Sequence, residues 1–337
     1  MQIGVLGGGG WGTALARLLD SNGHRVCMWT RQAHNARELN DKRQNTKYLP
    51  DIPLPEPLKF SSDLHESVEN SDVVVIAVPS NAVRELAANL IDVMRTSPLI
   101  VITSKGLEQG SLKTMSNVLT EILPNRFAGK ISVLSGPSFA IEVASNLPTA
   151  VTVAAHDPIV AKTIQNAFST STFRVYTSTD IVGVEIGSAV KNVIALAVGV
   201  SDGLGNGYNA RAALITRGIA EMTRLATRMG ADPQTLSGLA GIGDLVLTCT
   251  SDLSRNKTVG RRIGKGERLQ QIQSEMASTT EGVLNCGAIR NLAISLDVDM
   301  PIVNQTYELL FDGKNPAKAV VELLSRKTKP EFPAKAN

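Results

Sequence analysis

The sequence predicts an α/β N-terminal domain built on a doubly wound, mostly parallel sheet, followed by an all-helical C-terminal domain. Three observations support this fold class. Short runs rich in valine and isoleucine alternate with amphipathic segments through the first half of the 337 residues. A glycine-rich turn follows the first of these runs. Beyond about residue 180 the runs stop, and apolar residues recur with helical periodicity.

The strand-like runs define the sheet in chain order. Runs without a polar residue, such as residues 73–78, are typical of strands that crossover helices bury on both faces. We therefore expect strands at residues 3–6, 25–29, 72–78, 99–103, 131–134 and 150–154.

The periodicity of apolar residues in the second half predicts helices over residues 181–200, 210–229 and 318–325. Asp232-Pro233 and Asn315-Pro316 each place a capping residue before a proline, which is typical of helix starts. A chain of this length favours about two domains. We expect residues 1–180 to form the sheet domain, residues 181–328 the helical domain, and residues 329–337 a flexible tail.

Composition and charge exclude several classes of protein. Hydrophobic residues make up 43% of the chain and charged residues 19%, which is typical of a globular protein and not of a disordered or fibrous one. The formal net charge of +3 provides no strong field for nucleic acid or an anionic membrane. The longest apolar stretch, near residues 189–200, is shorter than the roughly 20 residues of a membrane span. The first residues lack a signal-peptide pattern, so we expect a cytoplasmic protein with no membrane span.

The cysteines and histidines restrict the chemistry. Cys27, Cys249 and Cys286 are far apart and form no CxxC pair, which argues against a disulfide framework or a zinc site. We expect packed thiols and no bound metal. The last of the four histidines is His156, so acid–base chemistry in the second half requires another type of residue.

The glycine-rich turn predicts a dinucleotide site. Gly7, Gly9 and Gly12 fit the pattern G-x-G-x-x-G between a strand-like run and a helical segment. In that pattern the first glycine makes the turn, the second admits the pyrophosphate, and the third lets helix and strand pack closely. The alternative is a flexible glycine turn, which the position between strand and helix disfavours.

The end of the second strand bears on the choice of cofactor. Chains that bind NAD place an acidic residue about 20 residues beyond the glycine turn, where it bonds the ribose 2′-hydroxyl. This chain has Trp29-Thr30-Arg31-Gln32 instead, with no acid to repel a 2′-phosphate and an arginine able to pair with one. We expect NADP(H) or NAD(H), with NADP(H) favoured. In the alternative interpretation, Arg31 is a solvated loop residue.

Lys191 is the leading candidate for acid–base chemistry. It lies in an apolar segment, residues 186–198, where a helix would bury most of its circumference. Burial disfavours the ammonium and lowers the pKa of a lysine from about 10.4 toward neutral pH, as a general acid/base requires. The structural alternative is a lysine that extends from a core helix to solvent.

Two further polar groups stand in apolar or glycine-rich surroundings. Asp244 follows Gly-Ile-Gly and precedes Leu-Val-Leu, so its carboxylate could hold a lysine or a substrate hydroxyl, or simply cap the next helix. Ser254, Arg255 and Asn256 offer a hydroxyl, a guanidinium and an amide in one turn, which suits a phosphate or a carboxylate. An ordinary polar loop is equally compatible with these three residues.

At these residues the sequence resembles the bacterial-type NAD(P)-dependent glycerol-3-phosphate dehydrogenases, over nearly the whole chain. The matching segments occur in the family's order. They are VLGGGGWGTAL from Val5, SKGLE from Ser104, SGPSFA from Ser135, EIGSAVKNVIALAVGVSDGLG from Glu185, NAR from Asn209, ALITRGIAEM from Ala213, GIGDLVLTCTSDLSRN from Gly241 and TEGV from Thr280.

The resemblance implies a Rossmann-like NAD(P)-binding domain and a substrate domain. It implies interconversion of dihydroxyacetone phosphate and sn-glycerol 3-phosphate, which supplies glycerophospholipid synthesis. Lys191 would be the catalytic lysine that protonates the ketone oxygen, with Asp244 fixing it. The implied substrate-binding residues are Lys105, Gly136, Ser138, Lys191, Asp244, Ser254, Arg255 and Asn256. The implied cofactor-binding residues are Gly7, Gly9, Gly10, Trp11, Gly12, Arg31, Lys105, Ala140, Arg255, Thr279 and Glu281.

Two residues depart from the family pattern. Gly10 stands where relatives usually carry serine or alanine, so backbone N–H would replace a side-chain contact with the pyrophosphate. Thr279 stands where many relatives carry an aliphatic residue. Neither position belongs to the proposed chemistry, but both affect the expected affinity for the cofactor.

Two other functions are alternatives to this interpretation. One is a related two-domain dehydrogenase that acts on a hydroxy acid or a nucleotide sugar, whose carboxylate would also suit Arg255. The other is a non-catalytic NADP(H)-binding sensor, although a sensor needs no buried acid/base such as Lys191. A homodimer is expected from the family and from the prevalence of two-fold assemblies.

Overall fold

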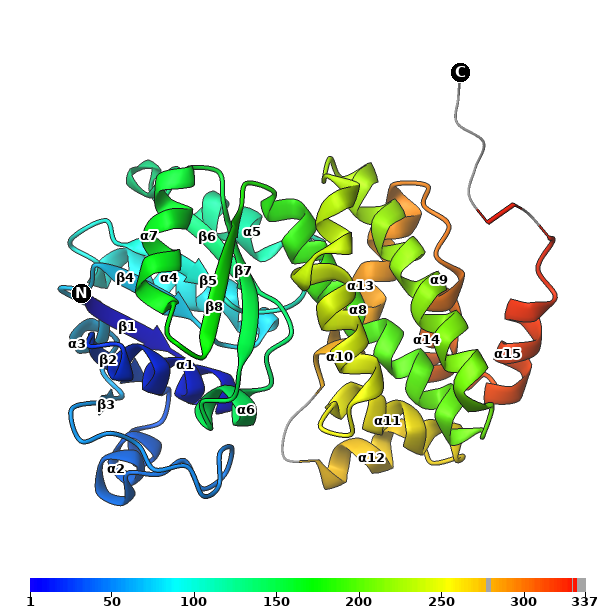
Figure 1. The fold of residues 1–337 in the computed structure, drawn as a ribbon, viewed down its shortest axis with the longest axis horizontal. Helices are drawn as coiled ribbons and strands as arrows, with labels where there is room; N and C mark the ends of the chain where they lie inside the picture. Colours follow the sequence, from blue (N-terminus) through cyan, green and yellow to red (C-terminus); the bar gives the residue numbers. More distant parts are fainter. Residues whose placement is uncertain (277–279, 329, 332–337) are drawn as a thin grey trace.

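The computed structural model describes residues 1–276, 280–328 and 330–331. It confirms the fold class, because an eight-stranded, mostly parallel sheet with flanking helices precedes a helical part (Figure 1). Most of the expected tail, residue 329 and residues 332–337, lies outside the described residues, as does Thr279.

The sheet reverses its strand order between β1 and β4. Its order is β3-β2-β1-β4-β5-β6-β7-β8, and all neighbouring strands are parallel except β6 and β7. Ligands of such sheets bind beyond the carboxyl ends of the strands at the reversal point. The strands are β1 (Gln2–Leu6), β2 (Arg25–Trp29), β3 (Lys59–Ser61), β4 (Val73–Ile76), β5 (Leu99–Ile102), β6 (Ile131–Ser135), β7 (Thr149–Ala155) and β8 (Phe173–Ser178).

Helices cover both faces of the sheet. Apolar residues of α1 and α7 pack on one face with Ile3 and Val5, and residues of α4 and α5 pack on the other with Leu6 and Val74. The helical segments of this half are α1 (Gly10–Ser21), α2 (Ala33–Lys42), α3 (Leu64–Val68), η1 (Ser80–Ala82), α4 (Val83–Val93), α5 (Met115–Ile122), η2 (Asn125–Phe127), α6 (Ala140–Ala144) and α7 (Pro158–Phe168).

All six expected strands are present, but two strands were not expected. β3 has three residues, and β8 alternates buried and exposed side chains, so neither forms an uninterrupted apolar run. Both lie at the edges of the sheet, where one neighbouring strand is missing.

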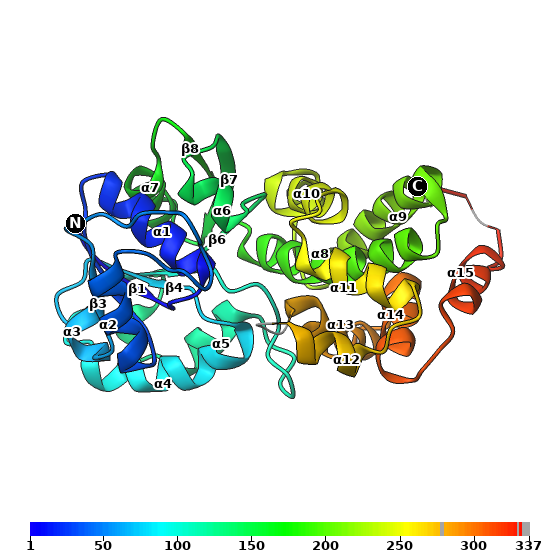
Figure 2. The ribbon, with the colours of Figure 1, turned by 90° about the horizontal axis from the view of Figure 1, so that it is seen from below.

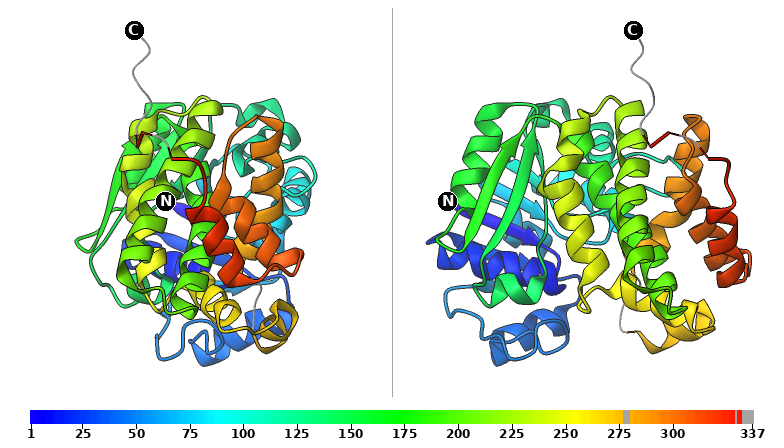
Figure 3. Two further views of the ribbon diagram at one scale, coloured as in Figure 1. Left: turned by 90° about the vertical axis from the view of Figure 1, so that its right-hand side faces the viewer. Right: turned by 45° about the vertical axis from the view of Figure 1, so that its right-hand side comes forward.

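The second half is helical, with α8 in its middle (Figures 2 and 3). The expected caps are present, since the side chains of Asp232 and Asn315 accept backbone N–H groups at the starts of η3 and α15. The segments are α8 (Ile181–Gly203), α9 (Gly207–Arg228), η3 (Pro233–Ser237), the single π-helical turn η4 (Leu239–Gly243), α10 (Asp244–Thr250), α11 (Arg255–Gly264), α12 (Leu269–Glu275), α13 (Glu281–Ser295), α14 (Pro301–Phe311) and α15 (Pro316–Leu324).

Among the described helices, α8 alone is long and apolar enough to cross a membrane by length and composition. Its most apolar 18-residue window has a mean hydropathy of 1.7, but 89% of that window is buried inside the protein. Its neighbours are α9, α10, α11 and α13. The apolar character of α8 is therefore that of a core helix.

Glycines let α8 and α11 approach each other closely. A Cβ at Gly199 would collide with the carbonyl oxygen of Lys257, and a Cβ at Gly260 with that of Leu196. Gly203 and Gly264, one turn further along each helix, are in the same situation. These four glycines therefore serve helix packing rather than loops.

A buried glutamate joins α8 to the sheet half. The carboxylate of Glu185 on α8 accepts the backbone N–H of Ser116 at 2.8 Å and its hydroxyl at 2.5 Å, at the start of α5. The first N–H groups of a helix have no partner within it, so this carboxylate satisfies a donor that would otherwise be buried unpaired. Burial raises the pKa of Glu185 above its ordinary value, although the bonds from Ser116 act in the opposite direction.

We expect Glu185→Ala to destabilise the protein by about 2–3 kcal/mol, because it leaves buried donors at the start of α5 without an acceptor. Denaturant unfolding followed by circular dichroism measures this change. Glu185→Gln keeps an acceptor oxygen of similar shape and serves as the control with a smaller loss. Equal unfolding midpoints for Glu185→Ala and wild type would show that the contact does not stabilise the fold.

Candidate active site

The residues expected at the site gather beyond the carboxyl ends of β1, β4, β5 and β6, where the helical part meets the sheet. The glycine turn follows β1, Lys105 follows β5, and Gly136 follows β6, while Ser80, which was not among the expected residues, follows β4. Helix α8 supplies Lys191, and the segment from η4 to α11 supplies Asp244 and Asn256. This is the edge at which such sheets bind ligands.

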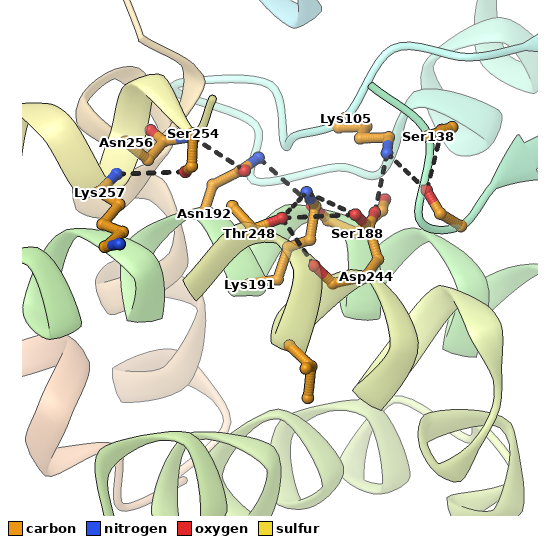
Figure 4. A network of polar contacts seen from close by, with 12 residues as sticks. Lys105, Ser138, Ser188, Lys191, Asn192, Asp244, Thr248, Ser254, Asn256 and Lys257 are labelled. Carbon is orange, nitrogen blue, oxygen red and sulfur yellow. Dashed lines mark hydrogen bonds and ion pairs between the residues drawn. The ribbon is translucent and has the colours of Figure 1, made fainter. Parts of the chain in front are cut away.

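One carboxylate joins the two lysines. Asp244 Oδ1 lies 2.9 Å from Lys191 Nζ, and Asp244 Oδ2 lies 2.8 Å from Lys105 Nζ (Figure 4). Lys191 is 5% exposed and Asp244 is 1% exposed, so both charges are removed from water. Two ammonium groups and one carboxylate leave a local net charge of +1, which favours an anion or a developing oxyanion.

The environment lowers the pKa values of both Lys191 and Asp244, and this suits Lys191 for acid–base chemistry. Burial lowers the pKa of Lys191 to about 8, although Asp244 acts against this change. Burial alone would raise the pKa of Asp244, but the ammonium groups of Lys105 and Lys191 outweigh it and lower that pKa. Asp244 therefore stays ionised at neutral pH, while Lys191 changes its charge within about one pH unit of neutral pH.

Thr248 completes the surroundings of Lys191 and was not predicted from the sequence. Lys191 Nζ donates to Thr248 Oγ1 at 2.7 Å, and Thr248 Oγ1 in turn donates to the carbonyl oxygen of Asp244 at 2.6 Å. An ammonium has three N–H groups. With Asp244 and Thr248 as its acceptors among the described residues, Lys191 retains one N–H for a substrate oxygen. The spacing of four residues from Asp244 on one helix was the available signal.

The loop after β6 approaches the same lysine pair. Lys105 Nζ donates to the carbonyl oxygen of Gly136 at 3.3 Å, and the hydroxyl of Ser138 donates to that oxygen at 2.9 Å. Gly136 has a φ of +148°, which favours glycine. Ala140, the first residue of α6, lies instead beside the glycine turn, 3.7 Å from where a Cβ on Gly10 would stand. Gly136 and Ser138 therefore join the lysine network, and Ala140 the cofactor side.

The glycine turn has the geometry that a pyrophosphate requires. Gly7 has a φ of +135°, and a Cβ on Gly12 would collide with the carbonyl oxygen of Gly7. Nothing lies within 4 Å of a Cβ position on Gly9, so the backbone there faces open space. Among the described residues, the buried indole N–H of Trp11 has no hydrogen-bond partner. An open backbone, a helix N-terminus and a donor without an acceptor fit an anionic dinucleotide.

Three further cofactor candidates are Arg31, Gly10 and Thr279. Arg31 is exposed in the loop between β2 and α2. Gly10 begins α1, and a Cβ there would make only a 3.4 Å contact with the carbonyl oxygen of Tyr48, so space alone does not require the glycine. Thr279 lies outside the described residues, so the prediction for it stays untested.

The turn at the start of α11 is held to α8 and α13. Ser254 caps α11 by accepting the N–H of Lys257 at 3.3 Å. The side-chain amide of Asn256 donates to Asn192 Oδ1 at 3.0 Å and accepts the N–H of Gly282 at 2.9 Å. Arg255, the first residue of α11, is exposed. These three residues therefore form the N-terminus of a helix rather than an ordinary polar loop. A helix N-terminus beside a guanidinium can bind an anion.

Glu281 connects the start of α13 to the loop after β4. Its carboxylate accepts the hydroxyl of Ser80 at 2.9 Å and the N–H of Ser80 at 3.4 Å. Burial raises the pKa of Glu281 above its ordinary value, and the guanidinium of Arg255 acts in the opposite direction. Glu281 and Arg255, far apart in sequence, thus interact electrostatically near the reversal point of the sheet.

Cys249, which follows Thr248 on α10, is close enough to Lys191 for the two groups to interact electrostatically. Cys249 and Cys286 are buried free thiols, as expected, and burial raises the pKa of each to about 12. Cys27 is a partly buried free thiol whose Sγ lies 3.7 Å from Ser67 Oγ.

Comparison with known proteins identifies the family of this chain. The chain matches the family profiles described as NAD-dependent glycerol-3-phosphate dehydrogenase N-terminus, over residues 2–161, and C-terminus, over residues 180–321. It is 50% identical over 330 residues to glycerol-3-phosphate dehydrogenase [NAD(P)+] of Citrifermentans bemidjiense, with 98% of both chains covered. It is also 50% identical over 332 residues to the enzyme of that name from Anaeromyxobacter sp. strain K, covering 98% of this chain and 100% of the relative.

A solved structure extends the comparison. The crystal structure of glycerol-3-phosphate dehydrogenase from Coxiella burnetii is 40% identical and superposes with a TM-score of 0.92 over 96% of this chain and 99% of the other. With both family profiles matched in order and half of the residues shared with curated relatives, the chain belongs to the NAD(P)-dependent glycerol-3-phosphate dehydrogenase family.

Proposed function

We propose that this chain transfers a hydride reversibly between NAD(P)H and dihydroxyacetone phosphate, giving sn-glycerol 3-phosphate, with Lys191 as general acid/base. The observation that carries the proposal is the buried pair of Lys191 and Asp244, placed where the sheet meets the helical part. A lysine with a pKa near 8 in a site with a net positive charge suits protonation of a ketone oxygen.

The cofactor would be held by the glycine turn and by residues around it. Gly9 and Gly10 would bring backbone N–H groups to the pyrophosphate, Gly7 and Gly12 would give the turn its shape, and Trp11 would supply its indole N–H. Arg31 would pair with a 2′-phosphate, which favours NADP(H). The proposed set is completed by Lys105, Ala140, Arg255, Thr279 and Glu281. When bound, the nicotinamide supplies or accepts the hydride.

The side chains of this protein would manage charge and protons. Lys191 donates a proton from Nζ to the ketone oxygen during reduction and takes it back during oxidation. Asp244 orients Lys191 and keeps it partly charged, and Lys105 offsets the negative charge that develops on the oxygen. Because Lys191 is buried, little water competes for its proton.

The substrate phosphate would bind at the start of α11. Arg255 and the first N–H groups of this helix supply positive charge, and Ser254 and Asn256 shape the turn. Gly136 and Ser138 would contact the part of the substrate near Lys105. Binding energy from the phosphate then positions the reacting carbon.

The proposal also includes a cellular setting. We propose a cytoplasmic homodimer that supplies sn-glycerol 3-phosphate for glycerophospholipids, with residues 1–180 as the cofactor domain and 181–328 as the substrate domain. The near balance of charge on the chain supports a small-molecule substrate rather than a nucleic acid.

Initial rates with dihydroxyacetone phosphate and with unphosphorylated dihydroxyacetone test the reaction. We expect rapid oxidation of NADPH, and slower oxidation of NADH, with the phosphorylated ketone only, because Arg255 and α11 act on the phosphate. Turnover of a hydroxy acid or a nucleotide sugar instead would support the alternative dehydrogenase. Tight NADPH binding without any turnover would support the sensor.

Replacing the proposed acid tests the mechanism. We expect Lys191→Met to lower kcat about 10²- to 10⁴-fold, because the ketone oxygen loses its proton donor. Steady-state kinetics on folded protein measures this loss. Lys257→Met is the matched control, since Lys257 is also a buried lysine but donates to Thr250 and Asp252. A kcat near that of wild type for Lys191→Met would exclude Lys191 as the acid.

The pH dependence should be opposite for the two directions. Ketone reduction requires protonated Lys191, so kcat/KM for reduction should fall as pH rises above about 8. Alcohol oxidation requires the neutral amine, so kcat/KM for oxidation should rise with pH and level off above about 8. Profiles of kcat/KM measured in both directions between about pH 6 and 10 cover the pKa of Lys191 and show both trends. Parallel profiles in both directions would contradict the assignment.

A further inference from the structure

Asn285 on α13 is a buried side chain that makes hydrogen bonds in two directions. It is 1% exposed. Its amide oxygen accepts the backbone N–H of Leu107 at 2.8 Å. Its amide nitrogen donates to the carbonyl oxygen of Glu281 and to Glu281 Oε2, each at 2.9 Å. One side chain thus links the turn after β5 with the start of α13.

The first partner belongs to the turn that carries Lys105. Leu107 is two residues beyond Lys105, and Gly106 lies between them. A Cβ on Gly106 would stand 2.5 Å from both amide atoms of Asn285 and 2.7 Å from the hydroxyl oxygen of Ser80. The turn therefore packs directly against Asn285, and two residues before Leu107 the same turn carries Lys105, whose Nζ donates to Asp244 Oδ2 at 2.8 Å.

The second partner is the carboxylate that reaches the loop after β4. Glu281 accepts hydrogen bonds from Ser80 and from Asn285 through the same oxygen, Oε2. Two donors on one oxygen fix the orientation of the carboxylate. Without Asn285, Glu281 Oε2 would lose one of its two donors, and the carboxylate would be held less firmly by the two bonds from Ser80.

We propose that Asn285 is a positioning residue that holds Lys105 on the substrate side and Glu281 on the cofactor side in one arrangement. The proposal rests on the proposed function, in which Lys105 contacts both ligands and Glu281 contacts the cofactor. Asn285 itself touches neither ligand and acts through these two residues. Its amide is suited to this task because it offers an acceptor to one partner and donors to the other.

A second bond between the same segments provides a matched control. Gln109 Nε2 donates to the carbonyl oxygen of Leu284 at 2.9 Å, also between the turn after β5 and α13. This bond is exposed and involves neither Lys105 nor Glu281. If Asn285 only fastened the two segments together, loss of the Gln109 bond would have effects of the same kind.

Two variants separate the two halves of the link. Asn285→Asp keeps the shape and an oxygen that accepts from Leu107, but it places a carboxylate oxygen against Glu281. Asn285→Ala removes both halves. Fluorescence titration with NADPH gives the Kd of the cofactor, steady-state rates give kcat and KM for dihydroxyacetone phosphate, and thermal unfolding gives Tm.

We expect Asn285→Asp to raise the Kd for NADPH about tenfold or more while KM for the ketone changes little, because only Glu281 is displaced. We expect Asn285→Ala to raise both constants and to lower kcat. Gln109→Ala should leave Kd, KM and kcat at wild-type values. Asn285→Asp alone decides the question if Asn285→Ala does not fold.

A lower Tm with unchanged Kd, KM and kcat in Asn285→Asp would overturn the proposal, since a purely structural role predicts that result. So would equal changes in Gln109→Ala and Asn285→Asp. A wild-type protein that does not reduce dihydroxyacetone phosphate would refute the proposed function instead. In that case the Kd for NADPH in the three variants still decides whether Asn285 positions Glu281.

Discussion

The carboxylate of Asp244 is the contact on which the arrangement of the site depends. It joins Lys105, on the turn after β5, to Lys191, on α8, and so connects the sheet with the helical part. Removing one partner from a buried ionic set leaves another charge without compensation, which costs more than the intact set contributes to stability. The three side chains therefore form one unit, and Glu185 and Asn285 hold the elements that carry it.

The centre of the sheet could be predicted from the sequence, but its edges could not. β4 is buried along its whole length, and such a strand is an uninterrupted apolar run. β8 lies at an edge, where Phe173 and Val175 are buried while Arg174 and Tyr176 are not, and β3 is too short to show any period. The antiparallel pairing of β6 and β7 was also not predictable, because an apolar run has no direction.

In the site, residues that are unusual in their sequence surroundings could be identified from the sequence. Residues of a common type in a common position could not. A lysine inside an apolar helix is conspicuous, and Lys191 was identified for that reason. Thr248 and Asn285 are common on helices, and their partners lie 57 and 178 residues away, so only the fold shows their roles. Among the glycines, the sequence pointed to those of the turn after β1, whereas Gly199 and Gly260, which serve the packing of α8 on α11, were not predicted.

The packing of α8 on α11 has a consequence for the length of substrate that the proposed site can accept. Lys191 lies on α8, and the proposed phosphate site opens α11, so backbone-to-backbone contact sets the span between the proposed proton donor and the proposed anion site. Close-packed backbones do not adjust as a flexible side chain does. A ketone whose carbonyl and phosphate are separated by more or fewer bonds would reach one end of this span but not both. In the proposed binding mode, the preferred length of the substrate is thus built into the distance between two helices, and altering it would require moving a helix.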